Sequence, residues 1–112
     1  MKEKIEFVEF LEIEKKLEIK TGTVISVEEV AKSNKLIKLE VSFGDEIKTV
    51  VTNIKPLLGE NFKEKIEGKS FLFVTNLKPT TMMGIESHGM ILPGNIEGGE
   101  ILTVSGKDHK VL

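Results

Sequence analysis

The segment Asn76-Leu-Lys-Pro-Thr-Thr-Met-Met-Gly-Ile-Glu-Ser-His-Gly-Met-Ile-Leu92 is the most informative part of this 112-residue chain. It follows the apolar run Phe71–Val74, which is apolar on both faces and so predicts a central, buried strand. One Pro, two Gly and two adjacent Met then precede Met90–Leu92, which predicts the next strand. Connections of this composition often carry function, as the ligand-binding loops of small barrels do. We therefore expect a binding loop between two strands.

Three predicted strands precede this segment. Ile19–Glu29 is rich in Thr, Val and Ile, which favour strands. Lys35–Phe43 alternates apolar and polar residues, which is typical of a half-buried antiparallel strand. The loop Val30–Asn34 separates these two strands. A hairpin turn at Gly44–Glu46 leads into a third strand at Ile47–Thr52.

A helical insertion is expected after the third strand, because Pro56–Gly59 breaks the alternation. Asn61 is placed to cap a short helix over Phe62–Glu67, which Gly68 would end. The remaining expected elements are a fourth strand at Ser70–Leu77, a fifth at His88–Leu92, a turn at Gly98-Gly99, and a sixth short strand or edge piece at Ile101–Val104.

The order of these elements predicts the fold. Residues 5–17 form an N-terminal helical segment, where Phe7 and Phe10 begin an apolar pattern at helical spacing. Three meandering strands, a helix and two further strands are the order of a five-stranded OB barrel. We predict a single all-β domain over residues 1–112, with a five-stranded OB-fold barrel over residues 18–105, a short N-terminal helix and a helical insertion between strands 3 and 4. An SH3-like barrel is the alternative, but it lacks that insertion.

The charge of the chain offers little support for nucleic-acid binding by itself. All 16 basic residues are Lys, and 18 acidic residues leave a net charge of −2. Residues 1–18 carry this excess, so residues 19–112 are neutral. Phosphate neutralisation supplies much of the affinity for nucleic acids, so the lysines would have to cluster on one face. The absence of Arg removes bidentate contacts, and the absence of Trp and Tyr argues against a broad stacking platform.

Catalysis has weaker support still. The chain has no Cys, which excludes a disulfide, a thiolate metal site and a thiol nucleophile. Ser87 and His88 are neighbours in the chain and would point to opposite faces of a strand, so they do not form a nucleophile–base pair. His109 lies in a polar tail that we expect to be solvated, and two isolated His give no metal-ligand spacing. Gly94–Gly99 matches neither phosphate-loop pattern. We expect no catalytic residues, no metal and no cofactor.

The N-terminus lacks the apolar core of a signal peptide. No apolar run approaches the roughly 20 residues that cross a bilayer. We therefore expect a soluble, cytoplasmic protein without a membrane partner.

An OB barrel binds ligands across strands 2 and 3 and on the loops that join strands 1–2 and 4–5. In this chain those loops are Val30–Asn34 and Lys78–Ser87, and Lys38 and Lys48 could extend the surface between them. Each Lys taken alone is ordinarily a solvated charge, and the paired Met residues could equally fill the core. The prediction therefore depends on several candidate residues occurring together at the two loops where the fold binds ligands. The candidate residues are Lys32, Asn34 and Lys35 at the first loop and Asn76, Lys78, Met82, Met83 and Ser87 at the second.

Five motifs resemble the tRNA-binding domain of the OB type. This family occurs as small tRNA-binding proteins and within methionyl-tRNA synthetases, and the CsaA-type export chaperones are its relatives. The resemblance covers residues 18–105, and its most specific motifs are Asn76–Pro79 and Gly84–Met90. The other matching motifs are Glu18–Gly22, Ser33–Leu36 and Val51–Asn53.

The resemblance implies a barrel that usually forms a homodimer, recognises the shape of tRNA and leaves catalysis to a synthetase. It places RNA contacts at Lys35, Ser87 and Met90, and also at Asn76 and Lys78. The two Lys would contact phosphate. Ser87 and Asn76 would bond phosphate, sugar or base edges, and Met90 would pack against a sugar or base or else serve the core.

The chain departs from the family pattern at four places, and Thr80-Thr81 removes positive charge at the proposed site. Lys20 stands where the family has Arg, and Thr80-Thr81 stands where a basic pair follows Leu-Lys-Pro. Val30-Ala31 replaces a usual His-Pro, and Thr52-Asn53 replaces a usual Ser-Gly. Three functions therefore stay open: a homodimer that binds tRNA or structured RNA and assists methionyl-tRNA synthetase, a protein-binding export chaperone, and a scaffold subunit that docks on a synthetase through its N-terminal helix.

Overall fold

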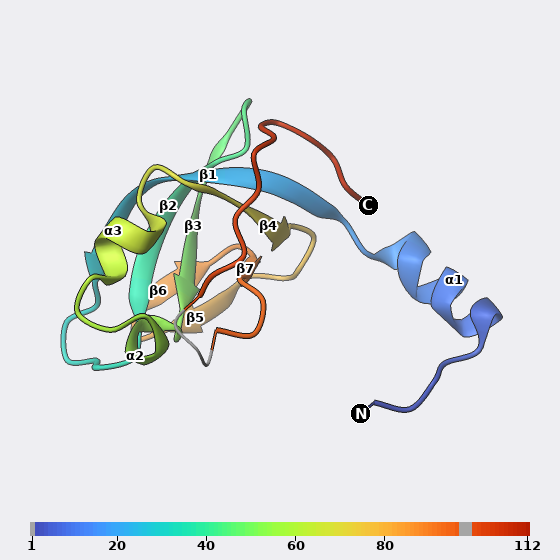
Figure 1. The fold of residues 1–112 in the computed structure, drawn as a ribbon, viewed down its shortest axis with the longest axis horizontal. Helices are drawn as coiled ribbons and strands as arrows, with labels where there is room; N and C mark the ends of the chain where they lie inside the picture. Colours follow the sequence, from blue (N-terminus) through green and yellow to red (C-terminus); the bar gives the residue numbers. More distant parts are fainter. Residues whose placement is uncertain (1, 97–99) are drawn as a thin grey trace.

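The computed structural model describes residues 2–96 and 100–112, and most of its regular structure is β. Five strands form one antiparallel sheet, with one helix before it and two short helices inserted between its third and fourth strands (Figure 1). The elements are α1 (Phe7–Lys16), β1 (Ile19–Glu29), β2 (Ile37–Ser42), β3 (Ile47–Thr52), α2 (Lys55–Leu58), α3 (Phe62–Ile66), β4 (Ser70–Val74), β5 (Thr80–Met82), β6 (Ile85–Ser87) and β7 (Met90–Leu92).

The sheet curls because its longest strand, β1, belongs to both halves. The strand order is β3-β2-β1-β4-β7. β1 pairs with β4 through Ile19–Thr23 and with β2 through Thr23–Glu29, and the register shifts between Val24 and Ser26. A bulge of this kind bends a strand and increases its twist. The result is a curled half-barrel in which β3 comes back toward the segment before β7, where the His88 N–H donates to the Thr49 carbonyl oxygen at 2.9 Å.

The five predicted strands correspond to β1, β2, β3, β4 and β7; β1 and β3 have the predicted bounds, and the other three are shorter. β2 begins at Ile37, β4 ends at Val74 and β7 begins at Met90. The predicted cap by Asn61 is wrong: its φ and ψ of −91° and 29° are not the extended values of an N-cap, and its side chain makes no capping bond. The expected strand over Ile101–Val104 is reduced to one bridge, from Ser70 to Val104.

Three elements were not predicted, α2, β5 and β6. α2 begins at Lys55 and has Pro56 in its first turn, where Pro suits a helix, whereas the sequence predicts only a break there. β5 and β6 form a small hairpin inside the segment that was expected to be a loop, with Thr80 paired to Ser87. Its two-residue turn, Met83-Gly84, has positive φ at both positions, 50° and 81°, as hairpin turns of this length require. The predicted turn at Gly98-Gly99 lies outside the described residues.

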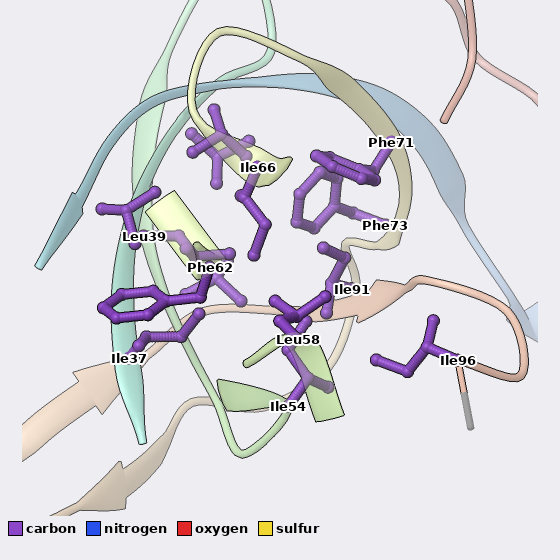
Figure 2. Packing of buried hydrophobic residues seen from close by; sticks show 14 of the residues in the cluster. Ile37, Leu39, Ile54, Leu58, Phe62, Ile66, Phe71, Phe73, Ile91 and Ile96 are labelled. Carbon is purple, nitrogen blue, oxygen red and sulfur yellow. The ribbon is translucent and has the colours of Figure 1, made fainter. Parts of the chain in front are cut away.

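The core fills the concave side of the sheet (Figure 2). Ile37 and Leu39 on β2 point into it, and on β4 Phe73 meets Phe43 edge to face, with ring centroids 5.5 Å apart. Buried side chains of α2 and α3 complete the packing, namely Leu58, Phe62 and Ile66.

The two ends of the chain differ in how they meet the sheet. α1 has no buried residue and projects away from the sheet (Figure 1). The last residues return to β1, where the Thr21 N–H donates to the His109 carbonyl oxygen and the Val111 N–H to that of Ile19. The polar tail is therefore paired through its backbone, while the His109 side chain stays exposed. No helix in the described part of the chain has the length and apolarity to cross a membrane.

Candidate nucleic-acid interface

Four of the candidate residues meet between β3 and the β5–β6 hairpin. Lys78, Met82, Ser87 and Met90 line one pocket of about 170 Å³ together with Val51. The pocket exists because the hairpin folds back against β3. Thr80 and Thr81, which stand where the family has a basic pair, belong to strand β5, and Thr80 lines the same pocket.

Ser87 holds this pocket together from inside. Its hydroxyl accepts the Val51 N–H at 2.9 Å and donates to the Gly89 carbonyl oxygen at 3.3 Å. The residue is only 4% exposed. Ser87 thus ties β6 to the edge of β3 and satisfies a backbone N–H in the interior.

Asn76 performs a similar task at the junction of α1 and β1. Its side-chain oxygen accepts the Glu18 N–H at 2.9 Å, and its side-chain nitrogen donates to the Lys16 carbonyl oxygen at 2.5 Å. Beside it, the Thr75 hydroxyl donates to the Glu18 carboxylate at 2.5 Å. This bond, more than the nearby charge of Lys20, holds the pKa of Glu18 below its ordinary value against a smaller opposing effect of desolvation.

The loop between β1 and β2 presents its polar residues to solvent. The Ser33 hydroxyl accepts the N–H groups of Lys35 and Leu36, at 3.2 and 3.0 Å, which fixes a tight turn. Lys32, Asn34 and Lys35 are exposed around this turn. Asn34 lines a second pocket, against α2 and α3. Asn34 and Lys78 therefore lie in separate pockets, and Lys32 and Lys35 line neither of them.

The lysines of the two loops differ from those of the strands in their electrostatic surroundings. Lys38 lies 3.9 and 3.8 Å from Glu28 and Glu40, and Lys48 lies 3.4 Å from Glu46. Lys38 and Lys48, which we expected to extend the surface, are therefore partly neutralised. In residues 2–96 and 100–112 no ion pair involves the three exposed loop lysines, Lys32, Lys35 and Lys78.

The surface around the Lys78 pocket is also apolar. Leu77, Met83 and Met90 are each about half exposed, and Met82 is half buried in the pocket wall. Met side chains adapt their shape to different ligands. The site offers one cation beside a deformable apolar rim, and over the described residues no group of three or more His, Asp or Glu is arranged to hold a metal ion.

Sequence reasoning missed Lys55 and Phe62, which line the second pocket with Asn34. Lys55 lies 5.2 Å from the centroid of the Phe62 ring and 3.5 Å from the Glu29 carboxylate. The pair Lys55-Pro56 is a sequence signal for a helix start after β3. A helix of only four residues, Lys55–Leu58, is too short for an apolar pattern to reveal.

Comparison with known proteins adds to this geometry. Residues 19–110 match the sequence model of the family described as "Putative tRNA binding domain". A methionine–tRNA ligase of Archaeoglobus fulgidus is 41% identical over 109 residues, an alignment that covers 95% of this chain and 16% of the ligase. The chain spans between 11% and 16% of the length of the methionine–tRNA ligases compared with it.

Two solved structures show the same fold. A MetRS-related protein from Pyrococcus horikoshii matches with a TM-score of 0.77 and 34% identity, over 99% of this chain and 100% of that one. The chaperone CsaA of Bacillus anthracis matches with a TM-score of 0.69 and 23% identity, over 98% of this chain and 100% of that one.

Proposed function

This chain belongs to the tRNA-binding domain family, as its sequence motifs predicted, and we propose that it binds tRNA as a non-catalytic, structure-specific homodimer. The observation that carries the proposal is the pocket in which Lys78 and Met90 meet beside the buried Ser87. We call this pocket, taken together with the exposed Lys32 and Lys35 on the loop between β1 and β2, the two-loop surface.

The uncompensated lysines support this assignment. Lys32, Lys35 and Lys78 have no acidic partner among the described residues, so each can meet a phosphate without first breaking an ion pair. Phosphate contacts of this kind position an RNA without reading its sequence. Asn34 would bond a sugar or base edge, and Met90 would pack against a sugar or base.

Ser87 and Asn76 take a different role in the proposal. The Ser87 hydroxyl is engaged with Val51 and Gly89, and both amide atoms of Asn76 are engaged with the backbone near Glu18. We therefore assign them to holding the hairpin and the start of β1 in place, so that they position the RNA contacts of their neighbours.

Two finer features of the fold belong to the same proposal. The bond from the His88 N–H to the Thr49 carbonyl oxygen joins the two edges of the curled sheet, which supports a closed OB barrel. The exposed side chains of Phe7, Val8 and Ile13 on α1 support a dimer, because a second copy could cover them.

The relatives suggest the setting of this activity. The A. fulgidus relative is a methionine–tRNA ligase, so we propose that the chain presents tRNA to a methionyl-tRNA synthetase and takes no part in the chemistry. A tRNA ligand would place it in the cytoplasm.

A protein-binding function of the chaperone type is the second candidate. It is favoured by the half-exposed Leu77, Met83 and Met90, which would suit an apolar peptide. A scaffold role, with α1 docked on a synthetase, depends on the same exposed helix that the dimer would use.

A mobility-shift titration with total tRNA tests the proposal. We expect binding in the micromolar range for the native chain, and at least tenfold weaker binding for Lys35→Ala combined with Lys78→Ala. Lys107→Ala, an exposed lysine of the C-terminal segment, serves as the matched control and should bind normally. Absence of a shift at low salt, together with tight binding of an unfolded apolar peptide, would support the chaperone function.

A further inference from the structure

The pocket beside Asn34 lies outside the Lys78 site and has its own chemistry. It has a volume of about 410 Å³ and is bounded by the end of β1, the loop between β1 and β2, and helices α2 and α3. Phe62, Pro56 and the backbone at Gly59 form its less polar walls. Its volume lies within the range of small-molecule sites, which is about 300 to 1,000 Å³.

Four polar side chains line this pocket, and two of them are paired. The Lys55 ammonium lies 3.5 Å from a Glu29 carboxylate oxygen, and it is held 5.2 Å from the centroid of the Phe62 ring. The Lys55 side chain is 21% exposed and that of Glu29 is 61% exposed, so the cation is largely covered while the carboxylate faces solvent and is open to a ligand. Asn34 and Glu60 have no hydrogen-bond partner within the described ranges of the chain.

The paired groups present a definite pattern to a ligand. Lys55 supplies N–H donors and requires an acceptor, while the adjacent Glu29 carboxylate has two oxygens that require donors. The Watson–Crick edge of guanine carries the complementary order, with the O6 acceptor followed by the N1–H and N2–H donors. Lys commonly donates to O6 of guanine, and the two oxygens of an ionised carboxylate can each accept one of two adjacent N–H groups.

We propose that this pocket binds the base of an unpaired guanosine in RNA. Glu29 would accept N1–H and N2–H, Lys55 would donate to O6, and Asn34 would reach the base or its sugar. Adenine, cytosine and uracil each place only one donor group on this edge, so none uses both carboxylate oxygens as guanine does. The inference rests on the proposed RNA-binding function and adds a guanine-specific contact to it.

The main competing ligand for two carboxylates is a cationic side chain of a protein. Glu29 and Glu60 would attract an arginine, but the Lys55 ammonium beside Glu29 would repel it. A free guanine nucleotide shares the base chemistry. Lys32 and Lys35 lie exposed on the adjoining loop, where they could follow an RNA backbone away from the pocket. We therefore favour an RNA nucleotide.

The test compares RNA hairpins that differ in one unpaired nucleotide. Fluorescein-labelled hairpins with a guanosine, an inosine or an adenosine in the loop are titrated with the full chain by anisotropy. We expect the guanosine hairpin to bind roughly tenfold tighter than the inosine hairpin, which lacks only the 2-amino group. Glu29→Gln should remove this preference. Glu28→Gln, which alters the neighbouring residue that faces Lys38, should retain it.

The other outcomes of these titrations distinguish the guanosine proposal from its alternatives. Equal binding of the three hairpins by a chain that still binds tRNA overturns the pocket assignment and leaves the proposed function intact, whereas loss of tRNA binding itself overturns the proposed function. Competition by GMP at the concentration at which the guanosine hairpin binds would assign the pocket to free nucleotides. Competition by an arginine-rich peptide, without a preference for guanosine, would assign it to a protein. Circular dichroism on both variants confirms folding.

Discussion

At the scale of single residues, several polar side chains do structural work within the motifs that resemble the family. Thr75 and Asn76 hold Glu18, the residue before β1, by hydrogen bonds. Asn76 accepts the Glu18 N–H, the Thr75 N–H donates to the Glu18 carbonyl oxygen, and the Thr75 hydroxyl donates to the Glu18 carboxylate. The pKa of Glu18 is lowered mainly by the Thr75 hydroxyl. A carboxyl whose pKa is lower in the folded than in the unfolded chain stabilises the fold at neutral pH, and this stabilisation is lost as the pH falls through the folded pKa.

We therefore expect Glu18→Gln to lower the stability at pH 7 and to reduce its acid sensitivity. The wild type should lose the Glu18 contribution below about pH 5, where an ordinary Glu carboxyl begins to take up a proton. The variant should approach the wild type in stability toward pH 3. Urea unfolding at several pH values measures this, with Glu12→Gln on the exposed part of α1 as the control. A constant difference between variant and wild type over the whole pH range would contradict the assignment.

Gly22 ends the first motif of the resemblance, and its role is spatial. A Cβ atom there would lie 2.6 Å from a Val41 methyl, 2.7 Å from the Phe43 ring and 2.9 Å from the Phe73 ring. We expect Gly22→Ala to destabilise the fold by about 1 to 3 kcal/mol, because the core must shift to make room. Gly106→Ala is the matched control, since nothing lies within 4 Å of its Cβ position. Equal midpoints in urea for both variants would show that the core yields easily.

At the residue scale, the structure assigns bonded structural positions to two of the residues that the sequence predicts as RNA contacts. The motifs predict Ser87 and Asn76 as RNA contacts, whereas in the structure their side-chain polar atoms form hydrogen bonds with the backbone. Motif positions do not reveal burial, which depends on β3 meeting β6. Lys78 and Met90 were chosen on the same grounds and do line an open pocket. Their contact with RNA stays a prediction.

At the scale of elements, the strands that could be predicted are those with long apolar alternation or apolar runs. β2 alternates through Ile37, Leu39 and Val41, and each of these is fully buried. The β5–β6 hairpin was missed because its strands have three residues each and its turn is Met83-Gly84 instead of Asn-Gly. The pairing of the C-terminal segment with β1 was missed because it uses backbone groups of a polar sequence.

The turn of this hairpin suggests a stabilising change. Met83 has a φ of 50°, a left-handed conformation that ordinary side chains avoid and Asn tolerates better. We expect Met83→Asn to raise the unfolding free energy by about 0.5 to 1 kcal/mol, because Asn-Gly is the preferred pair for a two-residue hairpin. Thr81→Asn, in the extended part of the same hairpin, should bring no such gain. Loss of stability in Met83→Asn, measured by urea unfolding, would indicate that the Met side chain packs against the hairpin.

At the scale of the whole molecule, α1 is the part that the sheet does not use. Phe7 is 71% exposed and stacks on Phe10, with ring centroids 6.4 Å apart. Asn76 holds the end of the helix at its junction with the sheet, next to a small pocket lined by Ile13 and Leu17. An exposed apolar helix of this kind is more readily explained by a partner than by solvent.

We predict that light scattering coupled to size exclusion gives twice the chain mass of 12.5 kDa. Phe7→Ser combined with Phe10→Ser should give the mass of one chain, because it removes the apolar face that the second copy covers. Glu12→Ser, on the same helix, is the control and should stay dimeric. A wild-type mass of 12.5 kDa at working concentrations would contradict the dimer and leave α1 free for another partner.

The net charge of −2 makes the tRNA claim depend on local clustering of lysines. The most direct test is the affinity for tRNA measured over a range of salt concentrations, for the wild type and for Lys35→Ala combined with Lys78→Ala. We predict an affinity that falls steeply with salt, and a shallower dependence in the double variant, by about one unit of the logarithmic slope for each phosphate contact removed. Equal slopes for the two proteins, or no binding at low salt, would contradict the claim that the two-loop surface binds tRNA.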